Sequence, residues 1–236
     1  MVGAPLLADY NVAPTKEVYA VVQQPARPEP ERDLPAERQL RVLTWGLIPS
    51  WAKDPSIASR LINARLETAA DKPAFRKAFA SRRCLLPADG YYEWYPAAQV
   101  GARGKPVKQP FFIRPREGGV LAMAGLYEIW RDPTRADEDP ARFRWTCTVL
   151  TTRAEDDLGH IHDRMPLMVE PRRWGQWLDP HRDAPADLLT PAQASGLEAY
   201  PVSRRVNDVR NNGPDLLTPL PLSPQGTAPT LGEPDG

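Results

Sequence analysis

Short runs of β-branched and aromatic residues recur along most of the chain, and this pattern predicts strands. Residues 15–22 (TKEVYAVV) form one such run and residues 40–45 form a second. Between them, residues 25–37 are rich in proline and charge, which is typical of a solvated loop. Five further strands are predicted at residues 83–86, 91–95, 110–113, 121–126 and 144–151.

Helices are few and short in this pattern. Lys72 and Pro73 open one helix, because proline suits a first turn and Phe75 and Phe79 then lie one turn apart on a single face. Residues 170–178 (EPRRWGQWL) form a second amphipathic segment. Glycine or proline separates most strands, so we expect a mostly antiparallel α+β fold, with irregular barrel-like sheets flanked by short helices.

Length and composition fit one folded domain. The chain has 236 residues and 28 prolines, which favours short strands and irregular connections over long helices. We expect a single domain over residues 1–221. The following residues, 222–236, are rich in proline and poor in apolar side chains, and we interpret them as a disordered tail.

Charge and cysteine content exclude several classes of protein. Lys plus Arg and Asp plus Glu number 30 each, so the chain is not a globally basic nucleic-acid binder, although a local basic patch stays possible. No apolar run is long enough for a bilayer, and no signal peptide opens the chain. Cys84 and Cys147 lie far apart in apolar contexts, which gives no basis for a zinc site or a disulfide framework. We expect a cytoplasmic monomer without cofactor or metal.

One segment concentrates positive charge. Between Arg60 and Arg83 there are seven basic residues, Arg65 and Arg76 among them, against two acidic residues. Trp45 and Trp51 lie shortly before this segment in the sequence. Basic side chains interleaved with aromatic rings are typical of single-stranded nucleic-acid binding. The alternative is a solvated helix face beside core aromatic residues.

Three polar residues could support chemistry. Glu93 lies among aromatic residues in GYYEW, where desolvation would raise the pKa of the carboxyl and suit it to acid-base catalysis; otherwise it is a surface glutamate of a strand. His162 in HIHDRMP could transfer protons or serve as a structural imidazole, with His160 as its neighbour. Asn63 in LINARLET is either a turn residue or an amide that orients a substrate.

Several long blocks together resemble the SOS response-associated peptidase family, the abasic-site processing proteins. The resemblance runs from Tyr10 to about residue 220 and includes these blocks in order: YNVAPT, WGLIPSWAKDPSIASRLINARLET, KPAFRKAF, RRCLLPADGYYEW, MAGLYEIW, TCTVLTT and HDRMPLMV. It implies an enzyme that binds abasic sites in single-stranded DNA and bonds covalently to the ring-opened sugar.

The resemblance also implies a role for each matching residue. Asn63 would orient the nucleophile and the sugar, Glu93 would shuttle protons during imine formation, and His162 would assist ring opening or reversal. The remaining matches would contact phosphates and bases: Trp45, Trp51, Arg65, Arg76 and Arg164.

The first residues depart from the family pattern. Family members carry a cysteine directly after the initiator methionine, because its α-amine forms an imine with the sugar aldehyde and its thiol then closes a thiazolidine ring. This chain begins Met1-Val2-Gly3, so we expect it to form no stable crosslink as written. Either the start site is misplaced or the chain is a truncated relic. The alternative functions are a non-catalytic binder of lesions in single strands and a peptidase limited to its own processing.

Overall fold

The computed structural model describes residues 5–23, 28–29, 32–33, 37–100, 106–154, 163–182 and 196–221. The strands are β1 (Glu17–Gln23), β2 (Pro28–Glu29), β3 (Arg32–Asp33), β4 (Arg38–Trp45), β5 (Asn63–Arg65), β6 (Arg83–Ala88), β7 (Tyr91–Val100), β8 (Pro106–Pro115), β9 (Leu121–Arg131), β10 (Phe143–Arg153), β11 (Arg164–Pro166) and β12 (Leu197–Pro201). The α-helices are α1 (Leu66–Ala69), α2 (Arg76–Ser81) and α3 (Trp174–Leu178). Short 3₁₀ helices are η1 (Pro55–Arg60), η2 (Pro140–Arg142), η4 (Pro171–Arg173), η7 (Arg204–Asn207) and η8 (Pro214–Leu217).

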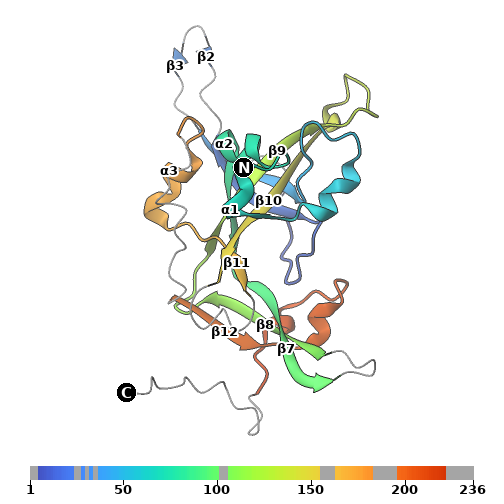
Figure 1. Ribbon diagram of the computed structural model, residues 1–236, viewed down its shortest axis with the longest axis vertical. Coiled ribbons are helices and arrows are strands. Elements are labelled where there is room, and N and C mark those ends of the chain that lie inside the picture. The colour runs from blue at the N-terminus through green and yellow to red at the C-terminus, as the bar shows by residue number, and fades with distance from the viewer. Residues whose placement is uncertain are drawn as a thin grey trace.

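Five strands close into a barrel, and a second sheet lies beside it (Figure 1). In the barrel, β10 pairs with β4, β4 with β1, β1 with β6, β6 with β9, and β9 with β10 again. Only the pairings of β10 with β4 and β5 are parallel among the described pairs. The second sheet has the antiparallel order β12-β8-β7. The expected mostly antiparallel α+β fold with barrel-like sheets is confirmed.

Two layers of apolar side chains stabilise the barrel, one in its interior and one on its outer face. Its interior contains side chains such as Leu43, Cys84 and Cys147. The outer face is covered by the short helices, where Phe79 of α2 and Trp177 of α3 pack against Leu126 of β9 and other strand residues. The predicted common face of Phe75 and Phe79 is confirmed, since both are buried. However, α2 begins at Arg76, because Lys72 and Pro73 form a turn ahead of it.

Several elements differ from the predicted ones in extent. The segment 25–37 contains the two-stranded ribbon β2 and β3 where an unpaired loop was expected. β7 continues through Pro96, and proline is tolerated there because β7 is an edge strand of its sheet. The strands β5, β11 and β12 were not predicted. The interpretation of residues 222–236 as a tail lies outside the described residues.

β10 pairs with several other strands and thereby positions the candidate site. Along one edge it pairs with β9 up to Val149, and beyond that point with β11. Leu167, just after β11, forms backbone hydrogen bonds with both β10 and β9. Its N–H donates to the carbonyl of Leu150, and its carbonyl accepts from the N–H of Ala124. The far end of β10 therefore lies between β5 and β11, which carry the polar segments singled out from the sequence.

Candidate functional site

A basic hollow of about 500 Å³ lies at the carboxyl end of β10. It is lined by Arg65, Arg153, Ala154, Asp163 and Arg164. Strand pairing explains this convergence, because Arg65 of β5 stands opposite Thr151 and Arg164 of β11 stands opposite Arg153. The fold thus brings together two of the residues predicted to contact DNA, Arg65 and Arg164, from distant parts of the sequence.

Asn63 and Arg65 share the outward face of β5. Successive side chains of a strand point to opposite faces, and here Ala64 is 1% exposed while its two neighbours are exposed. The side-chain amide of Asn63 makes no hydrogen bond within the described part of the chain. Asn63 is therefore available to a bound molecule on the same strand face as Arg65, which lines the hollow.

Arg164 is held in place by a carboxylate. Its two terminal nitrogens donate to the carboxylate oxygens of Glu67 at 2.8 and 2.9 Å, and its guanidinium also donates to the carbonyl of Thr151. Hydrogen bonding and the charge of Arg164 keep the pKa of Glu67 below its usual value, despite partial burial. A phosphate arriving in the hollow would share Arg164 with Glu67.

Glu93 lies on β7, two residues after the partly buried Tyr91. Tyr91, on the same face, packs against the cluster of Ile113 and Met165, and so does Ala154, which also lines the hollow. Burial, and secondarily the charge of Glu93, raises the pKa of the Tyr91 hydroxyl. That hydroxyl is buried and has no hydrogen-bond partner in the described chain. Glu93 itself is half-buried, as its aromatic sequence context indicated.

The two tryptophans predicted to contact DNA, Trp45 and Trp51, occupy different environments. The Trp45 ring packs in the barrel interior, and its indole nitrogen donates to the carbonyl of Ile62 at 2.8 Å, just before β5. Trp51 is 54% exposed and lines a second hollow of about 400 Å³ together with Lys53 and Arg60. Trp51 therefore offers an open ring face, whereas Trp45 supports the strand that carries Asn63.

Other predicted residues lie apart or outside the described residues. Arg76 is exposed at the start of α2. His162, like His160, lies outside the described residues, and so do residues 1–4. No cluster of three or more histidine, cysteine or acidic side chains that could hold a metal ion occurs in the described part of the chain. No helix among the described residues is long and apolar enough to cross a membrane.

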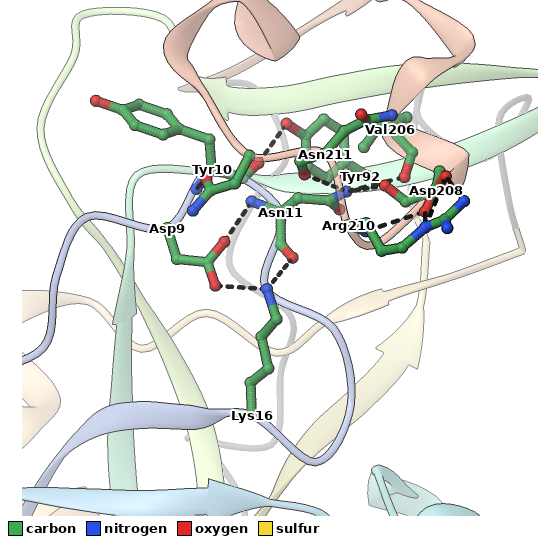
Figure 2. A network of polar contacts seen from close by, with 10 residues as sticks. Asp9, Tyr10, Asn11, Lys16, Tyr92, Val206, Asp208, Arg210 and Asn211 are labelled. Carbon is green, nitrogen blue, oxygen red and sulfur yellow. Dashed lines mark hydrogen bonds and ion pairs between the residues drawn. The ribbon is translucent and has the colours of Figure 1, made fainter.

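A polar network joins the beginning of the described chain to its end (Figure 2). The buried Asn11 amide donates to the carbonyls of Val206, Asp208 and Asn211. The hydroxyl of Tyr92, the neighbour of Glu93 on β7, donates to the Tyr10 carbonyl at 2.8 Å, and burial raises the pKa of Tyr92 to about 12. Sequence reasoning assigned no role to this network; the block YNVAPT was its only signal.

The sequence that builds these strands, the hollow and the network matches a known family. A model of the SOS response associated peptidase (SRAP) family matches residues 3–209. The chain belongs to the SRAP family. The match includes the strands β5, β7, β10 and β11, which carry the candidate site, and the resemblance stated from the sequence is confirmed.

Relatives of known name agree with this SRAP assignment. The abasic site processing protein YoqW of Bacillus subtilis is 38% identical over 212 residues, which cover 88% of this chain and 84% of YoqW. The abasic site processing protein HMCES of Gallus gallus is 33% identical over 214 residues, which cover 79% of this chain and 59% of HMCES. The abasic site processing protein YedK of Escherichia coli is 31% identical over 217 residues, which cover 89% of this chain and 84% of YedK.

Solved structures share this fold. A crystal structure of a protein from Bacteroides thetaiotaomicron aligns with a TM-score of 0.67 at 25% identity, covering 87% of this chain and 82% of that one. A crystal structure of a protein from Bordetella bronchiseptica aligns with a TM-score of 0.64 at 28% identity, covering 85% of this chain and 90% of that one.

Proposed function

We propose that this protein processes abasic sites in DNA and binds them in single-stranded DNA at the basic hollow. The observation that carries this proposal is the convergence of Arg65, Arg153 and Arg164 beside Asn63 and close to the strand of Glu93. Cationic side chains gathered in a hollow attract the phosphate backbone, and a polar edge beside them suits a sugar without a base. The names of the relatives support the same lesion.

In this proposal the residues of the binding surface have different roles. Arg65 and Arg153 neutralise phosphates, while Arg164 contributes part of its charge because Glu67 shares it. Trp51 stacks on a base, since its ring is more than half exposed and has Lys53 and Arg60 beside it. Arg76 extends the positive surface along α2.

The chemical step in this proposal is imine formation between a protein amine and the aldehyde of the ring-opened sugar. Amine and aldehyde combine to a carbinolamine, which loses water to give the imine. Glu93 donates the proton that the departing hydroxide takes up, and Asn63 orients the sugar. His162 assists ring opening or reversal, the role that the family resemblance implies for it.

A stable thiazolidine crosslink requires an N-terminal cysteine in addition. Its thiolate adds to the imine carbon and its amine nitrogen takes the proton, which closes a five-membered ring. Cys84 and Cys147 cannot do this, because both are completely buried in mid-chain and carry no free α-amine. In this proposal the described residues supply binding and proton transfer, whereas the ring closure would need an N-terminal cysteine, which the sequence beginning Met1-Val2-Gly3 does not provide.

Binding to synthetic single strands tests this function. We expect tighter binding to a single strand with one abasic site than to its duplex, with an affinity that falls as salt rises. Arg65→Ala should weaken binding and reduce the slope of log affinity against log salt by about 0.7. Arg135→Ala is the matched control, because Arg135 pairs with Asp139 between β9 and β10 and lines neither hollow. Equal effects of both variants would contradict the proposal.

Borohydride trapping separates the enzyme from a non-catalytic binder. Reduction of an imine leaves a covalent protein–DNA adduct that survives a denaturing gel. Trapping on abasic strands supports the enzyme, whereas tight binding without trapping favours a protein that only shields the lesion.

A further inference from the structure

The second sheet presents two different aromatic faces. Cross-strand partners share a face, so the register places Tyr92 and Trp94 with Phe112 and Tyr200 on one side. The ring centroids of Tyr92 and Phe112 lie 5.2 Å apart, and those of Phe112 and Tyr200 lie 5.9 Å apart. This face packs against Val202, Val206 and Leu217, so the C-terminal segment covers it.

The opposite face carries Glu93 between aromatic rings. Tyr91, Glu93 and Tyr95 alternate along β7 on this side, and Phe111 of β8 stands directly across from Glu93. The rings of Tyr95 and Phe111 meet edge to face, with centroids 6.3 Å apart and planes at 81°. At one end of the row Tyr91 is packed beside Met165, while at the other end Tyr95 is 39% exposed. The row therefore runs from the barrel out to an open ring next to the carboxylate.

We propose that Tyr95, braced by Phe111, forms a stacking platform for the nucleobase that flanks the abasic sugar. The inference rests on the proposed function, because it places the sugar at Glu93. Tyr95 lies two residues from Glu93, about 7 Å along the strand. An abasic sugar has no base of its own, so the neighbouring bases supply all the stacking surface near the lesion. Stacking on an aromatic side chain tolerates any base sequence, since every base has a π-face.

The geometry favours a ligand over further packing of the protein on itself. Edge-to-face contact with Phe111 fixes the Tyr95 ring while leaving part of it exposed to solvent. Tyr95 adds little ordering cost on binding, because a ring with two rotatable bonds is already restrained by its neighbour. The hydroxyl is not needed for stacking, so phenylalanine should replace tyrosine without loss.

A double-mutant cycle between Tyr95 and the flanking base tests the platform. The first probe is a fluorescent single strand with one abasic site between two adenines; the second has abasic sites at all three positions. On the first probe, Tyr95→Ala should weaken binding by about 5- to 150-fold. On the second probe the parent and Tyr95→Ala should bind alike, because no flanking base remains. Tyr95→Phe should match the parent on both probes.

Phe143→Ala provides the matched control. Phe143 is 44% exposed at the start of β10, under the guanidinium of Arg142, and lines neither hollow. Its removal should leave both affinities unchanged. Equal affinity of Tyr95→Ala and the parent for the first probe, or an equal loss on both probes, would overturn the platform while leaving the proposed function intact. A parent that binds neither probe would overturn the proposed function itself.

Discussion

The side-chain amide of Asn11 donates a hydrogen bond to the carbonyl of Val206 at 3.1 Å, across 195 positions of sequence. The same amide reaches the carbonyls of Asp208 and Asn211, each at 3.2 Å. Asn11 is 6% exposed and its hydrogen bond to the Val206 carbonyl is buried, so that carbonyl depends on Asn11 for a bond that water supplies elsewhere. One side chain thus fastens the segment before β1 to the loop after η7.

Asn11→Ala should lower the free energy of unfolding by about 2 to 3 kcal/mol. The substitution removes all three hydrogen bonds and leaves the buried Val206 carbonyl without its donor, which costs more than the net value of the hydrogen bonds. Urea unfolding followed by tryptophan fluorescence measures the change. The control is Asn212→Ala, because exposed Asn212 accepts a single bond from the Tyr10 N–H. Its expected loss is below about 1 kcal/mol, and equal losses would contradict the assigned role of Asn11.

Glu67→Gln should make the pH dependence of stability weaker in acid. Arg164 lowers the pKa of Glu67 in the folded protein, so the stabilisation from this pair is present above the ordinary glutamate pKa and is lost as the pH falls through the folded-state pKa. Because the Glu67 side chain is 46% exposed, solvent screens the pair and its contribution stays below about 1 kcal/mol. Unfolding midpoints of the parent and Glu67→Gln should therefore differ near neutrality and converge below about pH 4.

The same variant should bind single strands more tightly. Removing the carboxylate frees Arg164 for phosphate and makes the hollow more positive, which should raise affinity about fivefold at low salt. Glu170→Gln serves as the control, since Glu170 pairs with Arg172 and Arg173 away from the hollow. A weaker affinity of Glu67→Gln would mean that Arg164 needs Glu67 to hold a productive geometry.

Glu93→Gln should slow borohydride trapping of abasic single strands by about 10²- to 10⁴-fold. Glutamine keeps the size and polarity of the side chain but cannot donate the proton that assists loss of water. Equilibrium binding should stay within about twofold of the parent, because no phosphate contact is removed. Glu198→Gln, on the same sheet and paired with Arg114, should trap at the parent rate. Equal trapping rates of Glu93→Gln and the parent would make Glu93 a structural residue.

Cys84 and Cys147 should resist thiol reagents in the folded protein. Both lie inside the barrel at 0% exposure, and burial raises the pKa of each thiol, for Cys84 with a further contribution from its neighbour Cys147. The thiolate is the reactive form, so labelling with a disulfide reagent at about pH 8 should wait for unfolding. Two thiols should react promptly in concentrated urea. Rapid labelling of the native protein would show that the barrel opens locally.

Sequence patterns within a single segment predicted the strands and helices whose formation depends mainly on their own residues. The β-branched runs of β1, β4 and β10 and the shared face of Phe75 and Phe79 are visible in the sequence because each element carries its own periodicity. β5 is different. Its three residues form a strand because they pair with Val149 to Thr151 of β10, and a pairing between distant segments leaves no local signal.

The candidate site shows the same division. Charge counting between Arg60 and Arg83 indicated a basic segment, and the register of β10 decides which of its members line the hollow. Trp45 and Trp51 look equivalent in sequence, yet the alternation of β4 turns the first ring into the barrel while the second stands in an exposed loop. Asn11 is polar and near one end of the described chain, and nothing local indicates that it is buried.

The alternation along β7 also limits how SRAP chains of this type can vary in length. A one-residue insertion or deletion before Tyr91 would exchange the two faces of the strand and send the carboxylate of Glu93 toward Val202 and Val206. Only glycine fits at position 90, directly before β7, because a Cβ atom there would lie 2.4 Å from the Phe112 ring. Beyond the site, the irregular pairing between Pro96 and Val100 accommodates two extra residues on β7 without shifting Glu93. Natural gains and losses of residues should therefore gather at the tip of the β7–β8 hairpin and avoid its base.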